Sequence, residues 1–90
     1  MAATLPSVLA SVVVVQQDES DYFLVNLDRG DSVAVDRAEA RVFESCRKGT
    51  SMEDATHALA EELKAKDEDV LQRVRAALEH FQKLGLCASS

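Results

Sequence analysis

Hydrophobic residues follow two different spacings along this 90-residue chain, and the change predicts where strands give way to helices. The first part holds β-branched and aromatic runs at residues 12–16 and 22–27, separated by a polar turn. A shorter alternating run at residues 32–35 follows a second turn, in which Gly30 can adopt a positive φ. These runs predict three antiparallel strands joined by short turns.

After the third strand the hydrophobic period becomes helical. Asp36 and Glu39 have the spacing of a capping box, and a helix that begins there would end at Gly49. A second capping box at residues 50–53 predicts the next helix, and a third helix is expected at residues 68–84. Three strands followed by three helices predict an α+β domain of the winged helix-turn-helix type.

The predicted elements define one domain with two short ends. Residues 12–87 carry all of the strands and helices, whereas residues 1–11 are small and apolar without a clear period. We expect a flexible N-terminal arm over residues 1–11 and a short tail over residues 88–90. A domain of this size has one modest core with little room for an enclosed active site, which favours binding over catalysis.

Charge narrows the classes of function. The chain carries ten basic and sixteen acidic residues, a net charge of -6. Neutralising phosphates needs a basic face, so this balance opposes nucleic-acid binding and gives no attraction to anionic membranes. No basic n-region or bilayer-length apolar span is present, and we expect a cytoplasmic protein. Solubility is the simpler interpretation of the acidic excess.

Candidate chemistry is sparse. Cys46 and Cys87 lie far apart and match no ligand spacing, and His57 and His80 have no carboxylate or cysteine at such a spacing. The chain has only three glycines, which form no phosphate-binding loop. We therefore expect a protein that is not an enzyme and that uses no metal and no cofactor.

Four stretches carry a family resemblance through their order along the chain. They are residues 21–35, 38–46, 51–63 and 74–86. Gly30 is the turn glycine of the first stretch, Gly49-Thr50 follows the second as a hinge, and the last ends in Gly-Leu. Lys48 stands at the hinge where an aspartate is common. Together, residues 12–87 resemble the PqqD-like family, whose members are recognition elements of ribosomally made, modified peptides (RiPP recognition elements).

This resemblance implies a non-enzymatic module that binds the leader segment of a precursor peptide. The peptide would add as an antiparallel strand to the third strand, in a cleft between that strand and the last helix. The domain would then present the precursor to a modifying enzyme, often a radical SAM protein. We expect the domain itself to be a monomer or a weak dimer.

The expected peptide-binding residues come from the third strand and one margin of the last helix. The apolar band of that helix spans roughly 140°, wider than the ~100° stripe of a surface helix. The part assigned to the core comprises Val70, Val74, Ala77, Phe81 and Leu84. The expected site residues, which include Val74 as well, are Ser32, Val33, Ala34, Val35, Leu71, Val74, Arg75, Leu78 and Gln82. The simpler alternatives are that the whole band is core and that the strand is merely a short edge.

Residues 70–86 are also locally basic, with Arg73, Arg75 and Lys83 against Glu79. An acidic leader would be steered toward such a helix. Arg75 borders the apolar margin, and we expect it to contact the peptide. Ordinary solvated side chains are the alternative interpretation of these charges.

Two other functions fit the same topology. A winged-helix DNA-binding protein would need a basic recognition helix, but the second helix carries four carboxylates against Lys64. A regulatory or scaffolding subunit would grip its partner enzyme rather than a peptide. That role can coexist with peptide recognition, because a separate recognition domain must also contact its modifying enzyme.

Overall fold

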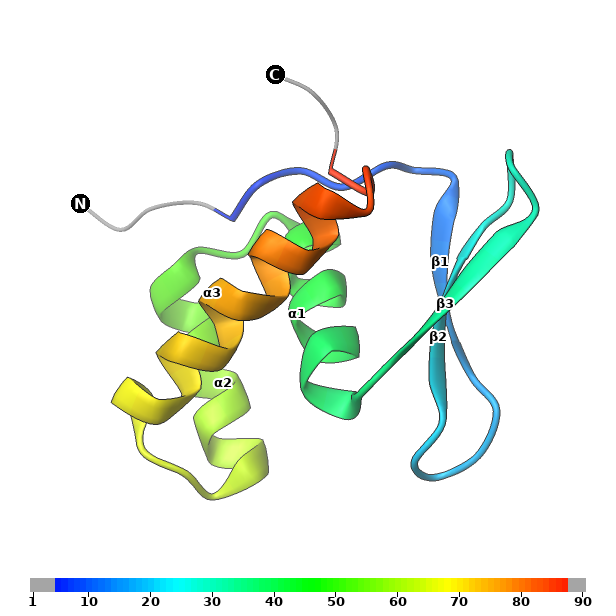
Figure 1. Cartoon of the computed structure of the whole chain (residues 1–90). Coiled ribbons are helices and arrows are strands. Elements are labelled where there is room, and N and C mark those ends of the chain that lie inside the picture. The colour runs from blue at the N-terminus through cyan, green and yellow to red at the C-terminus, as the bar shows by residue number, and fades with distance from the viewer. Residues whose placement is uncertain (1–4, 88–90) are drawn as a thin grey trace.

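The computed structural model describes residues 5–87 as a three-stranded antiparallel sheet followed by three helices (Figure 1). In chain order the elements are β1 (Val12–Gln16), β2 (Tyr22–Asn26), β3 (Asp31–Val35), α1 (Arg37–Lys48), α2 (Met52–Leu63) and α3 (Asp67–Lys83). The α+β class and the order of elements expected from the hydrophobic spacing are confirmed.

The two faces of the sheet have different surroundings. The strand order is β1-β2-β3, and the register places Val14, Leu24 and Val33 side by side across the three strands. Leu24 is 1% exposed, because this face packs against α1. All three helices lie on the same side of the sheet (Figure 1), so none of the described elements covers its opposite face.

Side chains that accept backbone hydrogen bonds shape both turns of the sheet. Asn26 is 5% exposed, and its Oδ1 accepts hydrogen bonds from the amides of Asp28 and Arg29 at 3.1 and 3.2 Å. Gly30 follows with a φ of 78°, a left-handed conformation that favours glycine. The Asp18 carboxylate has the same role in the β1–β2 turn. Local polar chemistry therefore fixes both hairpins.

The starts of α1 and α2 are capped by side chains, one as expected and one shifted. At α1 the Asp36 carboxylate accepts from the Glu39 amide at 2.8 Å, and Glu39 Oε1 accepts from the Asp36 amide at 3.3 Å. This confirms the first capping box. The N-cap of α2 is Ser51, whose Oγ accepts from the Asp54 amide at 3.1 Å. The capping box expected from Thr50 is wrong by one residue, because the Thr50 amide still closes the end of α1.

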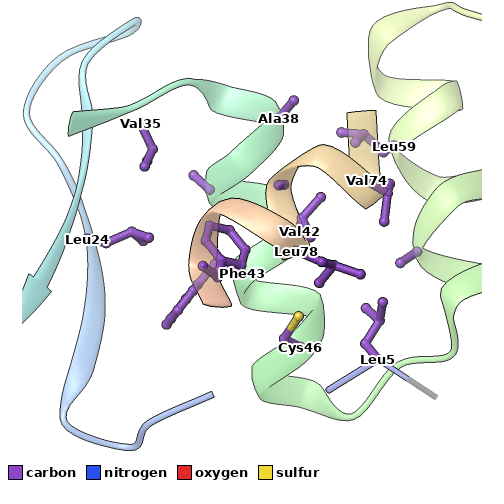
Figure 2. Packing of buried hydrophobic residues seen from close by; sticks show 14 of the residues in the cluster. Leu5, Leu24, Val35, Ala38, Val42, Phe43, Cys46, Leu59, Val74 and Leu78 are labelled. Carbon is purple, nitrogen blue, oxygen red and sulfur yellow. The ribbon is translucent and has the colours of Figure 1, made fainter. Parts of the chain in front are cut away.

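Two phenylalanines meet at the centre of the core. Phe43 of α1 and Phe81 of α3 are fully buried, with ring centroids 5.4 Å apart in an edge-to-face arrangement. Figure 2 shows the Phe43 ring on the side of α1 that faces Leu24 of β2. α1 is therefore the middle layer of the domain, with the sheet on one side and α2 and α3 on the other (Figure 1).

The core face of α3 is as expected except at its end. Val70, Val74, Ala77 and Phe81 are buried. The prediction that Leu84 lies in the core is wrong. Leu84 is 36% exposed, and Leu86 is buried in its place, with 7% of its surface exposed. The reason is that α3 ends at Lys83. Gly85 then adopts a φ of 71°, which reverses the chain and carries Leu86 inward.

The segment before β1 packs against the domain. Leu5 is 4% exposed, and its amide donates a hydrogen bond to the Thr50 carbonyl at 3.2 Å. Further along, the Leu9 amide donates to the Leu86 carbonyl at 2.9 Å. One buried leucine and two backbone hydrogen bonds therefore hold this segment across the ends of α1 and α3.

The flexible arm and its bounds stay a prediction, but its described part, residues 5–11, is anchored to the domain at Leu5 and Leu9. A single leucine without a repeating neighbour gives no periodic signal, yet it fills a place in the core. The start of the expected arm, residues 1–4, and the expected tail, residues 88–90, lie outside the described residues.

Truncation of Leu5 tests the packing of this segment. Leu5→Ala should lower the free energy of unfolding by about 2–3 kcal/mol, because it removes buried methyl groups and leaves a cavity. Leu27→Ala is the matched control, since Leu27 is 65% exposed and its truncation should change stability by about 0.5 kcal/mol or less. Urea unfolding followed by circular dichroism measures both, and equal midpoints would contradict a packed segment.

Candidate functional site

The two edges of the sheet differ in how open they are. The Arg47 guanidinium of α1 donates hydrogen bonds to the carbonyls of Ala10 and Val12, so the β1 edge is partly occupied. β3 pairs with β2 on one side only, and its Ser32 and Ala34 side chains are exposed. In the described part of the chain, β3 is thus the edge whose outward N–H and C=O groups are left for another strand.

A hollow of about 290 Å³ separates β3 from the end of α3. Its walls are Leu24, Asn26, Arg29, Asp31, Ser32, Val33, Leu84 and Leu86. The charged groups at its mouth, Arg29 and Asp31, form an exposed ion pair at 3.3 Å. Leucine and valine side chains line both of its sides, so this hollow suits an apolar side chain.

A second hollow, of about 310 Å³, lies along the same face of α3 toward the start of α1. It is lined by Asp36, Ala38, Glu39, Arg73, Ala76, Ala77 and His80. Helix positions three and four apart share a face, so residues 73, 76, 80 and 84 form one continuous wall. The first hollow borders β3 and the second borders the start of α1, and they share no lining residue. Because they follow one another along this face of α3, the two hollows are together called the β3–α3 groove.

The charges of the groove leave one arginine available. Glu39 Oε2 lies 2.7 Å from His80 Nδ1, which links α1 to α3, and the other Glu39 oxygen belongs to the capping box with Asp36. Both carboxylates at this end are therefore engaged. Arg73 makes no ion pair with any residue in the described part of the chain. Its guanidinium can therefore bind an anionic group that enters the groove.

The strand half of the expected site is present at the groove. Ser32 and Val33 line the groove, and Ala34 is exposed beside them. Val35 is 8% exposed and packs inward where β3 leads into α1. Small side chains thus flank the open backbone of β3.

Two helix residues that were expected beside β3 lie beside α2 instead. Leu71 and Arg75 line a separate hollow of about 340 Å³, together with Met52 and Thr56 of α2. Residues two apart on an α-helix point about 200° apart, so a helix that turns Arg73 toward the groove turns Arg75 away. The expected position of Arg75 opposite β3 is wrong.

The remaining helix residues of the expected site do not line the groove either. Val74 is fully buried, and Leu78 is 8% exposed. Figure 2 shows Leu78 directed into the core. Gln82 is exposed near the end of α3 and lines neither hollow of the groove. A contact of these residues with a peptide stays a prediction without support from the position of the groove.

The structure adds a set of groove residues that were not part of the expected site. They are Arg73, Ala76 and His80 of α3 and Leu84, which directly follows it. The periodic pattern shows two margins beside the core stripe, and it does not indicate which of them faces β3. The available signal was the Ala76-Ala77 pair, because small side chains let another chain approach a helix closely.

Neither cysteine is an activated nucleophile. Burial raises the pKa of the Cys46 thiol to about 11, and it also raises the pKa of the Cys87 thiol. Within residues 5–87, no group of three His, Cys, Asp or Glu side chains is arranged to hold a metal ion. The same residues contain no helix of the length and apolarity that crossing a membrane requires.

Comparison with known proteins points to one family. The sequence profile of the family described as coenzyme PQQ synthesis protein D (PqqD) matches residues 21–86. The structure of TbiB1 in complex with the TbiA(beta) leader peptide has a TM-score of 0.73 at 18% identity, and the match covers 93% of this chain and 96% of that one. Lasso peptide synthetase B1 complexed with the leader peptide has a TM-score of 0.71 at 16% identity, covering 91% and 95%. No curated protein matches the sequence.

The raised pKa of Cys46 predicts a pH dependence of stability. The unfolded thiol ionises near its ordinary value of 9.0, whereas the folded thiol keeps its proton to about 11. Between these values the folded state binds more protons, so stability falls as the pH rises. Cys46→Ala should remove this part of the decline. Urea midpoints from pH 8 to 10.5 measure it, and identical slopes for the two proteins would refute the protonated, buried thiol.

Proposed function

Because the chain belongs to the PqqD family, we propose that it binds the leader segment of a ribosomally made precursor peptide. The observation that carries the proposal is the open β3 edge beside the β3–α3 groove. The two proteins of similar fold described above were both solved with leader peptides, which supports the same class of ligand here.

The binding mode that fits this edge is addition of one antiparallel strand. Alternate residues of an edge strand turn their N–H and C=O groups outward, and an extended peptide pairs with them through its own backbone. These bonds do not depend on sequence, so they supply affinity for any extended segment. Specificity must come from the peptide side chains, which alternate between the groove and the outer face of the sheet.

The groove indicates which peptide side chains would be recognised. The hollow between Val33, Leu84 and Leu86 would take an apolar side chain, and burial there would add affinity through the hydrophobic effect. Next to Ala76 an incoming chain has room to approach α3. Arg73 at the other end would pair with a carboxylate. We therefore infer an extended leader with an apolar residue and an acidic residue on the same side.

The proposed role is binding and presentation rather than catalysis. A peptide held by its leader segment leaves the remainder free to enter a separate modifying enzyme, which gains from the raised local concentration. The family resemblance favours a radical SAM protein as that enzyme. Because its ligand is made by ribosomes, we place the proposed action in the cytoplasm.

Reversal of one arginine distinguishes the groove from the opposite margin of α3. Arg73→Glu should weaken binding of an acidic leader by about tenfold or more, because it replaces attraction by repulsion inside the groove. Arg75→Glu is the matched control: it has the same charge change two residues away, beside α2, and should bind as the wild type does.

Isothermal titration with a synthetic extended peptide, which carries an apolar and an acidic residue on the same side, measures both variants. The Arg73→Glu effect should shrink at high salt, since screening weakens an exposed charge pair. Greater weakening by Arg75→Glu than by Arg73→Glu would place the peptide on the α2 side and contradict this site.

Amide exchange tests strand addition directly. With leader peptide bound, outward-facing amides of β3 should exchange with deuterium more slowly, because each becomes hydrogen-bonded to the added strand. The amides of α2 serve as the internal control and should be unchanged. Residue-resolved exchange by NMR measures both, and β3 amides that exchange equally fast with and without saturating peptide would refute strand addition.

A further inference from the structure

The face of the sheet that points away from the helices is apolar. The register places its side chains in two rows across the strands, Val13, Val25 and Ser32 in one and Val15, Phe23 and Ala34 in the other. Val15 is 42% exposed. The outer patch is defined here as Val13, Val15, Phe23 and Val25, and none of these four is among the described residues that pack against the core.

Strand propensity alone does not account for the outer patch. Threonine is β-branched like valine and favours strands, yet it occurs in none of the three strands. An antiparallel sheet with one face on a core usually alternates apolar and polar residues, so that its other face is solvated. Grouped apolar side chains on an open face are typical of an interaction surface.

The charge of the chain is concentrated around this patch. Residues 12–36 carry six carboxylates and one arginine, a net charge of -5 out of -6 for the whole chain. Four of the carboxylates lie in the turns, Asp18, Glu19 and Asp21 in the first and Asp28 in the second, and all four are exposed. Of the other two, Asp31 begins β3 in an ion pair with Arg29, and Asp36 caps α1. The outer patch is therefore bordered by negative charge at both ends.

This charge selects among the possible occupants. The carboxylates of the two turns are called the rim of the outer patch. A second copy of the chain would bring two negatively charged rims together, and their repulsion would weaken binding. A partner with an apolar patch flanked by lysine or arginine would match both the outer patch and its rim. A nucleic acid or an anionic membrane would be repelled by the rim.

The β3–α3 groove lies beside the outer patch, and this position indicates which partner would bind the patch. On the proposed function, a leader peptide added to β3 becomes a fourth strand, and its outward side chains extend the outer face next to Ala34. A protein seated on the outer patch would then contact the bound peptide too. We infer that the outer patch is the docking surface for the enzyme that modifies the bound precursor, and that this enzyme presents an apolar surface bordered by basic residues.

The inference rests on the proposed function and has a thermodynamic consequence. If the enzyme contacts both the outer patch and the added strand, bound peptide strengthens enzyme docking. Linkage then requires that the docked enzyme strengthens peptide binding by the same factor. Binding of the leader peptide and docking of the modifying enzyme would be coupled through one continuous sheet.

A paired substitution tests the docking surface. Val15→Thr with Val25→Thr keeps β-branched side chains in the strands while placing hydroxyls on the outer patch. This variant should weaken binding of the enzyme that modifies the precursor by about tenfold or more, with unchanged affinity for the leader peptide. Leu27→Thr, at an exposed leucine outside the patch, should change neither affinity.

Surface plasmon resonance with the chain immobilised, with and without leader peptide, measures enzyme binding. Enzyme affinity that is equal for the wild type and the double variant would overturn the inference. So would a wild-type dimer in light scattering that the double variant abolishes, because the occupant would then be a second copy. Arg73→Glu distinguishes failure of this inference from failure of the proposed function. The variant should weaken binding of the leader peptide and leave enzyme docking to the peptide-free chain intact.

Charge reversal at the rim is a second test that does not depend on strand residues. Glu19→Lys with Asp28→Lys changes exposed turn positions and should weaken enzyme binding, mainly by slowing association at low salt. Retention of the wild-type association rate in this variant would rule out a basic partner surface. Circular dichroism melting of each variant identifies any loss of fold.

Discussion

The position of α1 between the sheet and α3 is the constraint on which the rest of the domain depends. Phe43 and Phe81 meet edge to face at its centre, and edge-to-face pairs add about 0.5–1.5 kcal/mol to the burial of their rings. This contact fixes the distance between α1 and α3, and together with the packing of the sheet on α1 it sets how far α3 stands from β3. The Glu39–His80 contact at 2.7 Å holds the same two helices at another point. The width of the groove is therefore a property of the core rather than of the groove residues.

Much of this architecture is predictable from local sequence, and the reason is local chemistry. The Asp36–Glu39 capping box and the turn at Gly30 depend on residues close in the chain, so their signals survive without tertiary knowledge. The side of α3 that meets β3 depends on the direction in which α3 crosses α1. No spacing in the sequence encodes that direction, so the margin of Arg75 looked as suitable as that of Arg73. Leu5 was missed because a single leucine without a repeating neighbour gives no periodic signal.

The single small sheet serves three separate purposes through its pleat and its edge. One face supplies the core through residues such as Leu24, the β3 edge offers backbone groups, and the other face displays the outer patch. Alternation of side chains keeps these surfaces independent, so a change on one face leaves the other in place. The negative charge is gathered at the turns, where it affects long-range encounter without entering the packed layers.

The contact of Arg47 with the carbonyls near the start of β1 has a consequence for self-assembly. A sheet with two open edges can join another at each end and so grow into a fibre, whereas a sheet with one open edge cannot continue such a chain. Here one side chain partly occupies β1, and a strand added to β3 would have α3 on its far side. On the proposed function, each molecule would therefore accept one extended segment, and no further strand could follow it. The tendency of an open edge strand to pair with other chains, which ordinarily promotes aggregation, would thereby be limited to one bound segment per molecule.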